Sequence, residues 1–145
     1  MQEQVSRSFA DIEFGDEIGP ITRTFTLEDV QRYGAVTNLT DERFLKQERA
    51  QQMGFVHPIV PGPLSATCLA RMLTDHFPHW RLRTFNVNFR TPVRHGDTLS
   101  FWGLVTEKSE QEEGGMVHCD MVAENQHGDR VIVGTATLVQ RNFQR

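Results

Sequence analysis

Alternation of apolar and polar residues in the second half of the chain predicts a series of β-strands. In Met116–Glu124 and in Arg130–Gln140 an apolar side chain recurs at every second position, as in a strand with one buried face. Arg83–Val93 and Thr98–Lys108 are also strand-like, and short glycine-containing turns (RHGD, QEEGG and NQHGD) separate the four segments. Because such turns join neighbouring antiparallel strands, this half is expected to form an antiparallel meander.

The first half contains helical patterns instead. The most apolar one runs from Pro63 to about Asp75, with apolar side chains over most of its circumference, which is typical of a buried helix. Before it, Ile21–Phe25 is expected to be a short strand and Asp41–Gln52 a more polar helix. Thr26 suits the N-cap of an intervening helix with acidic residues in its first turn. One buried helix and a strongly curved antiparallel sheet indicate a single α+β domain over residues 1–145, with the sheet wrapped round the helix in the hot-dog arrangement.

Charge and composition narrow the range of partners. The 145 residues carry 15 Lys and Arg against 19 Asp and Glu, a net charge of −4, and no basic run offers a footprint for a phosphate backbone. The apolar runs are much shorter than a membrane span, and the N-terminal residues lack the apolar core of a signal peptide. Cys68 and Cys119 have apolar neighbours, which favours reduced, half-buried thiols over a disulfide. We therefore expect a soluble cytoplasmic protein that binds neither nucleic acid nor membrane.

Two stretches carry a family resemblance. FVHPIVPGPLSATCLARML resembles the FGGPIAHGMLTASL segment that opens the central helix of MaoC-like and (R)-specific enoyl-CoA hydratases. FNVNFRTPVRHGDTLSF is similar to the second signature of that family, a strand ending in F-x-x-P-V-x-x-G-D-x-L. The resemblance covers roughly Phe14 to Arg141. It implies the hot-dog fold and chemistry on acyl thioesters carried by CoA or an acyl carrier protein, with no other cofactor.

One family motif is absent. The D-x-N-P-[IL]-H motif, whose Asp and His handle water in these hydratases, aligns its Asp with Leu39, its Asn with Asp41 and its His with Phe44. Neither Leu39 nor Phe44 can abstract a proton. The resemblance therefore implies a site that lacks the usual Asp/His dyad.

Gly62 is the position at which the role of a family residue transfers most directly to this sequence. It allows close approach of a ligand to the backbone, and its N–H at a helix start favours negative charge. In the family this amide donates a hydrogen bond to the thioester carbonyl. The alternative is a Pro-Gly-Pro sequence that only caps the helix, because Pro63 suits a first helical turn.

His57 precedes the same helix and is our candidate general base, since an imidazole titrates near neutral pH. The alternative is a loop histidine that packs locally. Asp41 and Thr40 are candidates for orienting His57 or holding a polar co-substrate, whereas in the plainer interpretation Thr40 caps the Asp41 helix. Substrate contacts are further expected from Phe44, Pro61 and Leu64. The other histidines lack metal-ligand spacing, so no metal is expected.

Three functions remain open. In the first, an enzyme adds or eliminates water, or an amine such as glycine, at the β-carbon of an acyl thioester. An amine is considered because the dyad that handles water is absent. In this respect the sequence resembles, more loosely, polyketide-pathway hot-dog enzymes that add glycine to an enoyl thioester. In the second, the chain is a catalytically silent subunit paired with an active paralogue. The third is plain thioester hydrolysis.

A homodimer is expected in any case, because two open sheet edges would otherwise favour aggregation. Arg83, Arg90 and Arg94 are either contacts for pantetheine phosphates or solvated.

Overall fold

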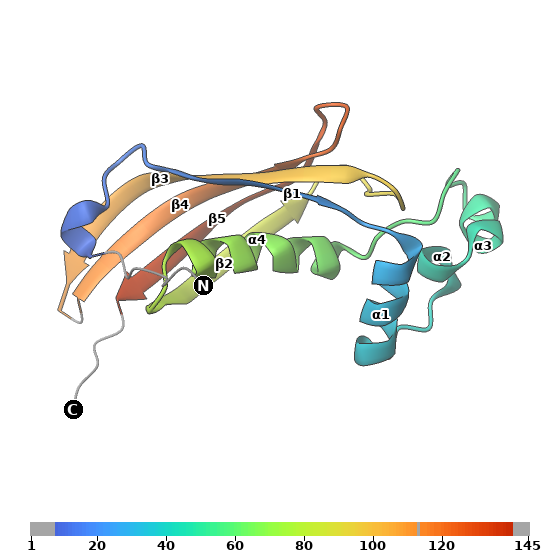
Figure 1. The fold of residues 1–145 in the computed structure, drawn as a ribbon, viewed down its shortest axis with the longest axis horizontal. Helices are drawn as coiled ribbons and strands as arrows, with labels where there is room; N and C mark the ends of the chain where they lie inside the picture. Colours follow the sequence, from blue (N-terminus) through green and yellow to red (C-terminus); the bar gives the residue numbers. More distant parts are fainter. Residues whose placement is uncertain (1–7, 113, 141–145) are drawn as a thin grey trace, which may run out of the picture.

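The computed structural model of the protein describes residues 8–112 and 114–140. A five-stranded antiparallel sheet curves over one long helix, α4, and three shorter helices gather beyond the N-terminal end of α4 (Figure 1). The α+β class and the hot-dog arrangement are thus confirmed. The strands are β1 (Glu17–Thr24), β2 (Trp80–Phe89), β3 (Thr98–Gln111), β4 (Gly114–Glu124) and β5 (Arg130–Gln140), and the helices are η1 (Phe9–Asp11), α1 (Leu27–Thr37), α2 (Glu42–Leu45), α3 (Gln47–Gln52) and α4 (Gly62–His76).

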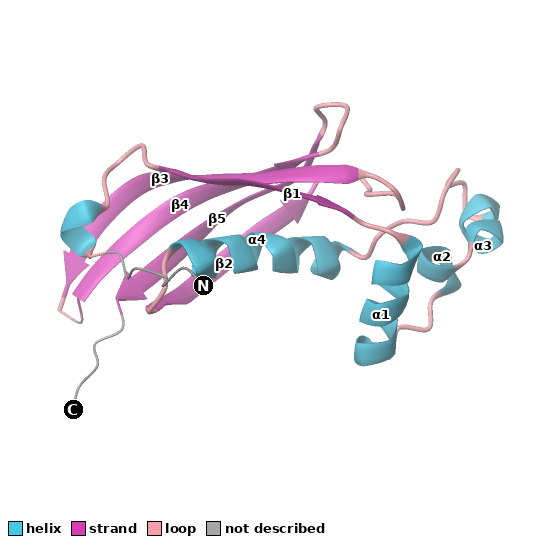
Figure 2. Ribbon diagram, viewed as in Figure 1, coloured by secondary structure: helices cyan, strands magenta, loops and turns pink. Residues whose placement is uncertain are grey.

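The strands lie in the order β1-β3-β4-β5-β2, so β3, β4 and β5 form the predicted meander (Figure 2). The bounds of β5 agree with the prediction, whereas β2 begins at Trp80 and ends at Phe89, four residues before the predicted end. Arg90 makes the next backbone hydrogen bond, from its N–H to the Val131 carbonyl at 2.9 Å. Pro92 then has no N–H to donate, so the chain leaves the sheet here. This departure opens the space described below.

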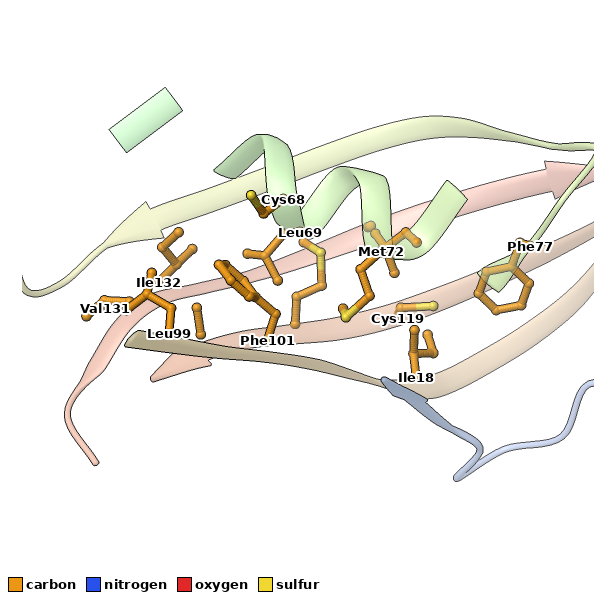
Figure 3. Close-up of a cluster of buried hydrophobic side chains, with 14 of the residues drawn as sticks. Ile18, Cys68, Leu69, Met72, Phe77, Leu99, Phe101, Cys119, Val131 and Ile132 are labelled. Carbon is orange, nitrogen blue, oxygen red and sulfur yellow. The ribbon is translucent and has the colours of Figure 1, made fainter. Parts of the chain in front are cut away.

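The core lies between α4 and the concave face of the sheet. Leu69 and Leu73 are fully buried, and Leu69 and Met72 point from α4 toward Phe101 and Cys119 on the strands (Figure 3). Burying each leucine side chain contributes about 1.5–3 kcal/mol. The opposite side of α4 is exposed at Pro63, Thr67, Arg71 and Thr74, so the helix is buried along one broad face rather than all round.

The segment between β1 and α4 is more broken than its sequence predicts. Thr26 caps α1 in a reciprocal box: its Oγ1 accepts from the Asp29 N–H, and an Asp29 carboxylate oxygen accepts from the Thr26 N–H. Asp41–Gln52 is two short helices, because Lys46 is extended between them. The N-cap of α2 is Asp41, whose Oδ1 accepts from the Arg43 N–H at 3.1 Å, so the expectation that Thr40 caps this helix is wrong. β1 begins at Glu17, earlier than the predicted Ile21, and its pairing with β3 shifts register between Ile18 and Ile21.

Both cysteines are free, as predicted, and both are buried rather than half-buried. Across the described residues, no helix combines the length and hydrophobicity that a membrane crossing requires.

Candidate functional site

Two pockets meet at the start of α4. The first, which we call the strand-side pocket, has a volume of about 420 Å³ and lies where β2 ends. The second, the helix-side pocket, has a volume of about 470 Å³ and lies between α4 and the end of α1. Phe44, Gly62 and Pro63 line both pockets. These three residues therefore mark the centre of the candidate site.

The walls of the strand-side pocket are mostly apolar. Only four polar side chains line it, and the two charged ones are both cations, Arg43 and Arg90. An apolar wall lowers the local dielectric and strengthens any charge–charge contact made inside. The apolar part of the wall comes from Phe44, Ile59, Val60, Phe89, Val93 and Val131.

The helix-side pocket is built by the C-terminal end of α1 and the residues after it. Asn38 ends α1 in the left-handed conformation, with φ 61°, and turns the chain so that Leu39, Thr40 and Asp41 face the same pocket as Gly62. The pocket also contains Tyr33, Thr37 and Pro61. Leu39 and Phe44, the residues aligned with the absent dyad, thus both lie beside Gly62.

Gly62 is the first residue of α4, one position before the predicted start, and Pro61 is its N-cap. Within the described residues the Gly62 N–H donates no hydrogen bond, while its carbonyl accepts from Ser65 Oγ at 3.0 Å. A free N–H at the positive end of a 15-residue helix is suited to polarising a carbonyl oxygen.

A short backbone ladder joins the two signature segments of the sequence. The Val60 N–H donates to the Val93 carbonyl at 2.7 Å, and the His95 N–H donates to the Pro58 carbonyl at 2.9 Å. Ile59 and Arg94 are the bridge partners between these bonds. The loop that leads into α4 and the segment that follows β2 are therefore held together, and they form adjacent walls of the strand-side pocket.

Arg43 lies between Asp41 and Phe44. Its Cζ stands 4.6 Å from the centroid of the Phe44 ring, and its Nε lies 3.0 Å from Asp41 Oδ2. The Nε atom is shielded from solvent and makes no hydrogen bond within the described residues, so its contact with Asp41 is electrostatic. The guanidinium group is thus stacked on one side and paired on another, which restricts its position at the pocket.

His57 lies in an exposed loop and lines neither pocket. It is close enough to His95 for its charge to lower the pKa of that residue. The main cause of the lowered pKa of His95 is burial, against which the carbonyls of Phe44 and Ile59 act. His95 Nε2 is buried and has no hydrogen-bond partner among the described residues. Its position in a turn gave no sign of this burial.

The structure brings together most of the predicted site residues. Thr40, Asp41 and Pro61 share the helix-side pocket with Gly62, and Phe44 reaches both pockets. Leu64 lines neither pocket and packs, partly buried, against the core. Sequence reasoning did not identify three lining residues, Arg43, Phe89 and Arg90, as parts of one pocket. The available signals were the place of Arg43 next to Phe44 in the motif region and the places of Phe89 and Arg90 in the second signature.

No group of three or more His, Cys, Asp or Glu side chains that could hold a metal ion occurs in residues 8–112 and 114–140. The expectation of a metal-free site stays a prediction.

Comparison with known proteins gives the same fold and a family. The family model of the MaoC like domain matches residues 12–127. A mitochondrial 3-hydroxyacyl-[acyl-carrier-protein] dehydratase of Arabidopsis thaliana is 26% identical over 123 residues, which are 84% of this chain and 74% of that protein. Because that relative is mitochondrial, the cytoplasmic location stays a prediction.

Two solved structures show the hot-dog fold. The R-hydratase PhaJ1 of Pseudomonas aeruginosa superposes with a TM-score of 0.83 at 23% identity, covering 93% of this chain and 86% of that one. A chain of the ChsH1–ChsH2 complex of Mycobacterium tuberculosis gives a TM-score of 0.77 at 17% identity, covering 89% of this chain and 98% of that one.

Proposed function

Because the chain belongs to the family of MaoC-like domains, we propose that it is an enzyme of the hydratase and dehydratase class that acts on acyl thioesters. The observation that carries this proposal is the position of Gly62, whose unpaired N–H begins α4 at the junction of the two pockets. The dehydratase named above acts on a 3-hydroxyacyl group held by a carrier protein. We take a CoA or carrier-protein thioester as the substrate class here.

In the proposed reaction the Gly62 N–H donates a hydrogen bond to the thioester oxygen. Negative charge builds up on this oxygen, as an enolate, when a nucleophile adds to the β-carbon or, in the elimination direction, when the α-proton is removed before the β-substituent leaves. One well-placed donor stabilises such charge by roughly 3 kcal/mol. The positive end of the α4 dipole acts in the same direction. The nucleophile is water or an amine such as glycine.

In the addition, Asp41 or His57 takes the proton that the attacking water or amine loses, and a proton is delivered to the α-carbon. In the elimination, the same group removes the α-proton, and the leaving group takes up a proton. Asp41 shares the helix-side pocket with Gly62, and its action as the base requires its carboxylate to turn away from Arg43, which both of its oxygens contact. His57 is exposed in the loop before α4, and its role as the base requires that the bound thioester or a second protomer reach that loop. We propose a homodimer, whose second copy would complete the acyl channel.

A second function is favoured by one observation. Leu39 and Phe44 place two apolar side chains beside Gly62 at the positions aligned with the family's Asp and His. A chain with this arrangement would serve as the silent partner of an active paralogue and supply part of the acyl channel. The fold match to one chain of the two-component ChsH1–ChsH2 complex accords with this alternative.

Mass spectrometry of products separates these functions. Purified protein is incubated with crotonyl and octenoyl thioesters of CoA and of a carrier protein, with and without glycine. A β-hydroxy or β-amino product establishes addition and identifies the nucleophile, while free acid indicates hydrolysis. If the purified protein leaves every thioester unchanged and becomes active only with a paralogue, the enzyme proposal fails and the silent subunit is supported.

Variants then assign the base. We expect Asp41→Asn or His57→Ala to abolish product formation, depending on which residue carries the proton. His127→Ala is the matched control, because His127 is exposed in the turn between β4 and β5, away from both pockets. Activity that survives both variants would exclude both residues as the base.

A further inference from the structure

The strand-side pocket is lined by positive charge, although the chain as a whole has a net charge of −4. Its two charged lining residues, Arg43 and Arg90, are cations set among apolar side chains. Among residues 8–112 and 114–140, no acidic side chain lines this pocket; Asp41 lines the neighbouring one. Within the described residues Arg90 makes no ion pair. The pocket therefore offers positive charge that the protein itself only partly balances.

Contacts with Asp41 and Phe44 restrict the side chain of Arg43 and leave its terminal nitrogens free to donate hydrogen bonds. Asp41 Oδ1 accepts a hydrogen bond from the Arg43 backbone N–H, and Asp41 Oδ2 lies 3.0 Å from Arg43 Nε as an ion pair, without the geometry of a hydrogen bond. Phe44 supports the flat face of the guanidinium, with 4.6 Å between Cζ and the ring centroid. The terminal Nη1 and Nη2 groups make no hydrogen bond with any described residue. These two donors form the planar fork that matches a carboxylate.

Arg43 also lies close in the chain to the residues that surround Gly62, where the thioester carbonyl is proposed to bind. It precedes Phe44, and Phe44 lines both pockets together with Gly62. A thioester whose carbonyl is bound at Gly62 would extend its acyl chain, or a second reactant, toward these residues. This step rests on the proposed function.

From these observations we infer that Arg43, supported by Arg90, binds a carboxylate group carried by the substrate of this site. Two sources supply this chemistry. The first is the terminal carboxylate of a dicarboxylic acyl thioester, and the second is the carboxylate of a small amino acid that acts as the nucleophile. In both cases the planar fork of the guanidinium pairs with the carboxylate, and the contact with Phe44 leaves the guanidinium less freedom to lose on binding.

Equilibrium binding by isothermal titration calorimetry tests the first source. The ligands are succinyl-, glutaryl- and adipyl-CoA, each compared with the butanoyl-, pentanoyl- or hexanoyl-CoA of equal chain length. If the acyl chain carries the carboxylate, wild-type protein binds at least one dicarboxylic member about ten- to a hundred-fold more tightly than its neutral counterpart. Arg43→Gln removes this preference but leaves binding of the neutral thioester within about two-fold, a change below RT and thus near the noise of such comparisons.

The second source is tested with protein saturated by butanoyl-CoA, which cannot undergo addition at its β-carbon. Glycine and glycinamide are titrated in turn, since they differ in the carboxylate. If the amino acid carries the carboxylate, glycine binds and glycinamide does not, and Arg43→Gln abolishes the difference. Arg90→Gln is expected to weaken the same preference less than Arg43→Gln.

Arg49→Gln is the matched control, because Arg49 is an exposed arginine on α3 that lines neither pocket. Arg43→Lys retains the charge without the fork and should restore only part of the preference. Circular dichroism confirms that each variant is folded. The inference is overturned if wild-type protein prefers neither the dicarboxylic thioesters nor glycine. It is also overturned if Arg43→Gln weakens the neutral thioesters and free CoA equally, because the guanidinium then serves the carrier phosphates. Failure of the neutral thioesters to bind wild-type protein would instead contradict the proposed function.

Discussion

The ring of Phe89 packs so closely on Gly62 that a Cβ atom added to Gly62 would lie 2.8 Å from Phe89 Cε1. Gly62 is helical and is not among the residues with positive φ, so glycine is required here for space rather than for backbone conformation. The two signature segments of the sequence meet at this contact.

Gly62→Ala is therefore expected to displace the Phe89 ring into the strand-side pocket. Overpacking of this kind costs about 1–3 kcal/mol, and the partly exposed ring favours the lower end. We expect weaker thioester binding together with a small decrease in the free energy of unfolding, measured by calorimetry and by urea titration. In a Phe89→Ala background the same change should cost less, which a double-mutant cycle measures. Additive effects of the two substitutions would contradict the steric explanation.

Restoring the family dyad tests whether the site geometry is still competent. Leu39→Asp combined with Phe44→His places a carboxylate and an imidazole beside Gly62. General acid–base groups contribute about 10²–10⁴-fold, so hydration of a crotonyl thioester should rise at least about a hundred-fold over wild type. Phe44→Gln is the control, since it adds polarity without a titrating group. A folded double variant with no gain in rate would show that more than the dyad has changed.

His95 should make stability depend on pH. Its pKa in the folded protein lies below the ordinary value because burial disfavours the imidazolium. Above about pH 6.5 the imidazole is neutral in both states and contributes no pH dependence. As the pH falls below this value, the unfolded chain takes up a proton that the folded chain resists, so the free energy of unfolding decreases. Urea unfolding of His95→Asn should lose part of this decrease, whereas the exposed control His127→Asn should keep it.

The two thiols should react slowly in the folded protein. Burial raises the pKa of Cys119 to about 12, and it also raises the pKa of Cys68, although Arg23 beside Cys68 acts in the opposite direction. Since the thiolate is the reactive form, both should resist alkylation near neutral pH, with Cys119 the slower. Mass spectrometry of iodoacetamide-treated protein, native and in urea, measures this order. Rapid native labelling of Cys119 would contradict the buried position on β4.

The sequence was most informative where a local pattern decides the structure. The bounds of β5 followed from period-two alternation, and the α1 cap followed from Thr26 with acidic residues after it. Local patterns were less decisive in the segment before α4. Lys46 interrupts a polar stretch that seemed continuous, and Asp41 rather than Thr40 provides the cap.

In the candidate site too, some residues could be predicted from local motifs and others are brought together only by the fold. Gly62 and Phe44 could be found from aligned motifs because those motifs fix their spacing. Arg43 and Arg90 are 47 positions apart (90 − 43), and only the fold places them on one pocket. The burial of His95 likewise depends on its contact with the loop before α4, which no pattern within its own turn reveals.

The ladder between residues 58–60 and 93–95 has a consequence for how the pocket adapts. Two backbone hydrogen bonds, of 2.7 and 2.9 Å, would have to break before the loop entering α4 could move away from the segment after β2. The entrance therefore behaves as a fixed frame without a hinge. We therefore expect differences in substrate size to be accommodated by Phe89, whose exposed ring lines the strand-side pocket. Substitutions of this side chain, rather than changes in loop length, would be the route to a different substrate range.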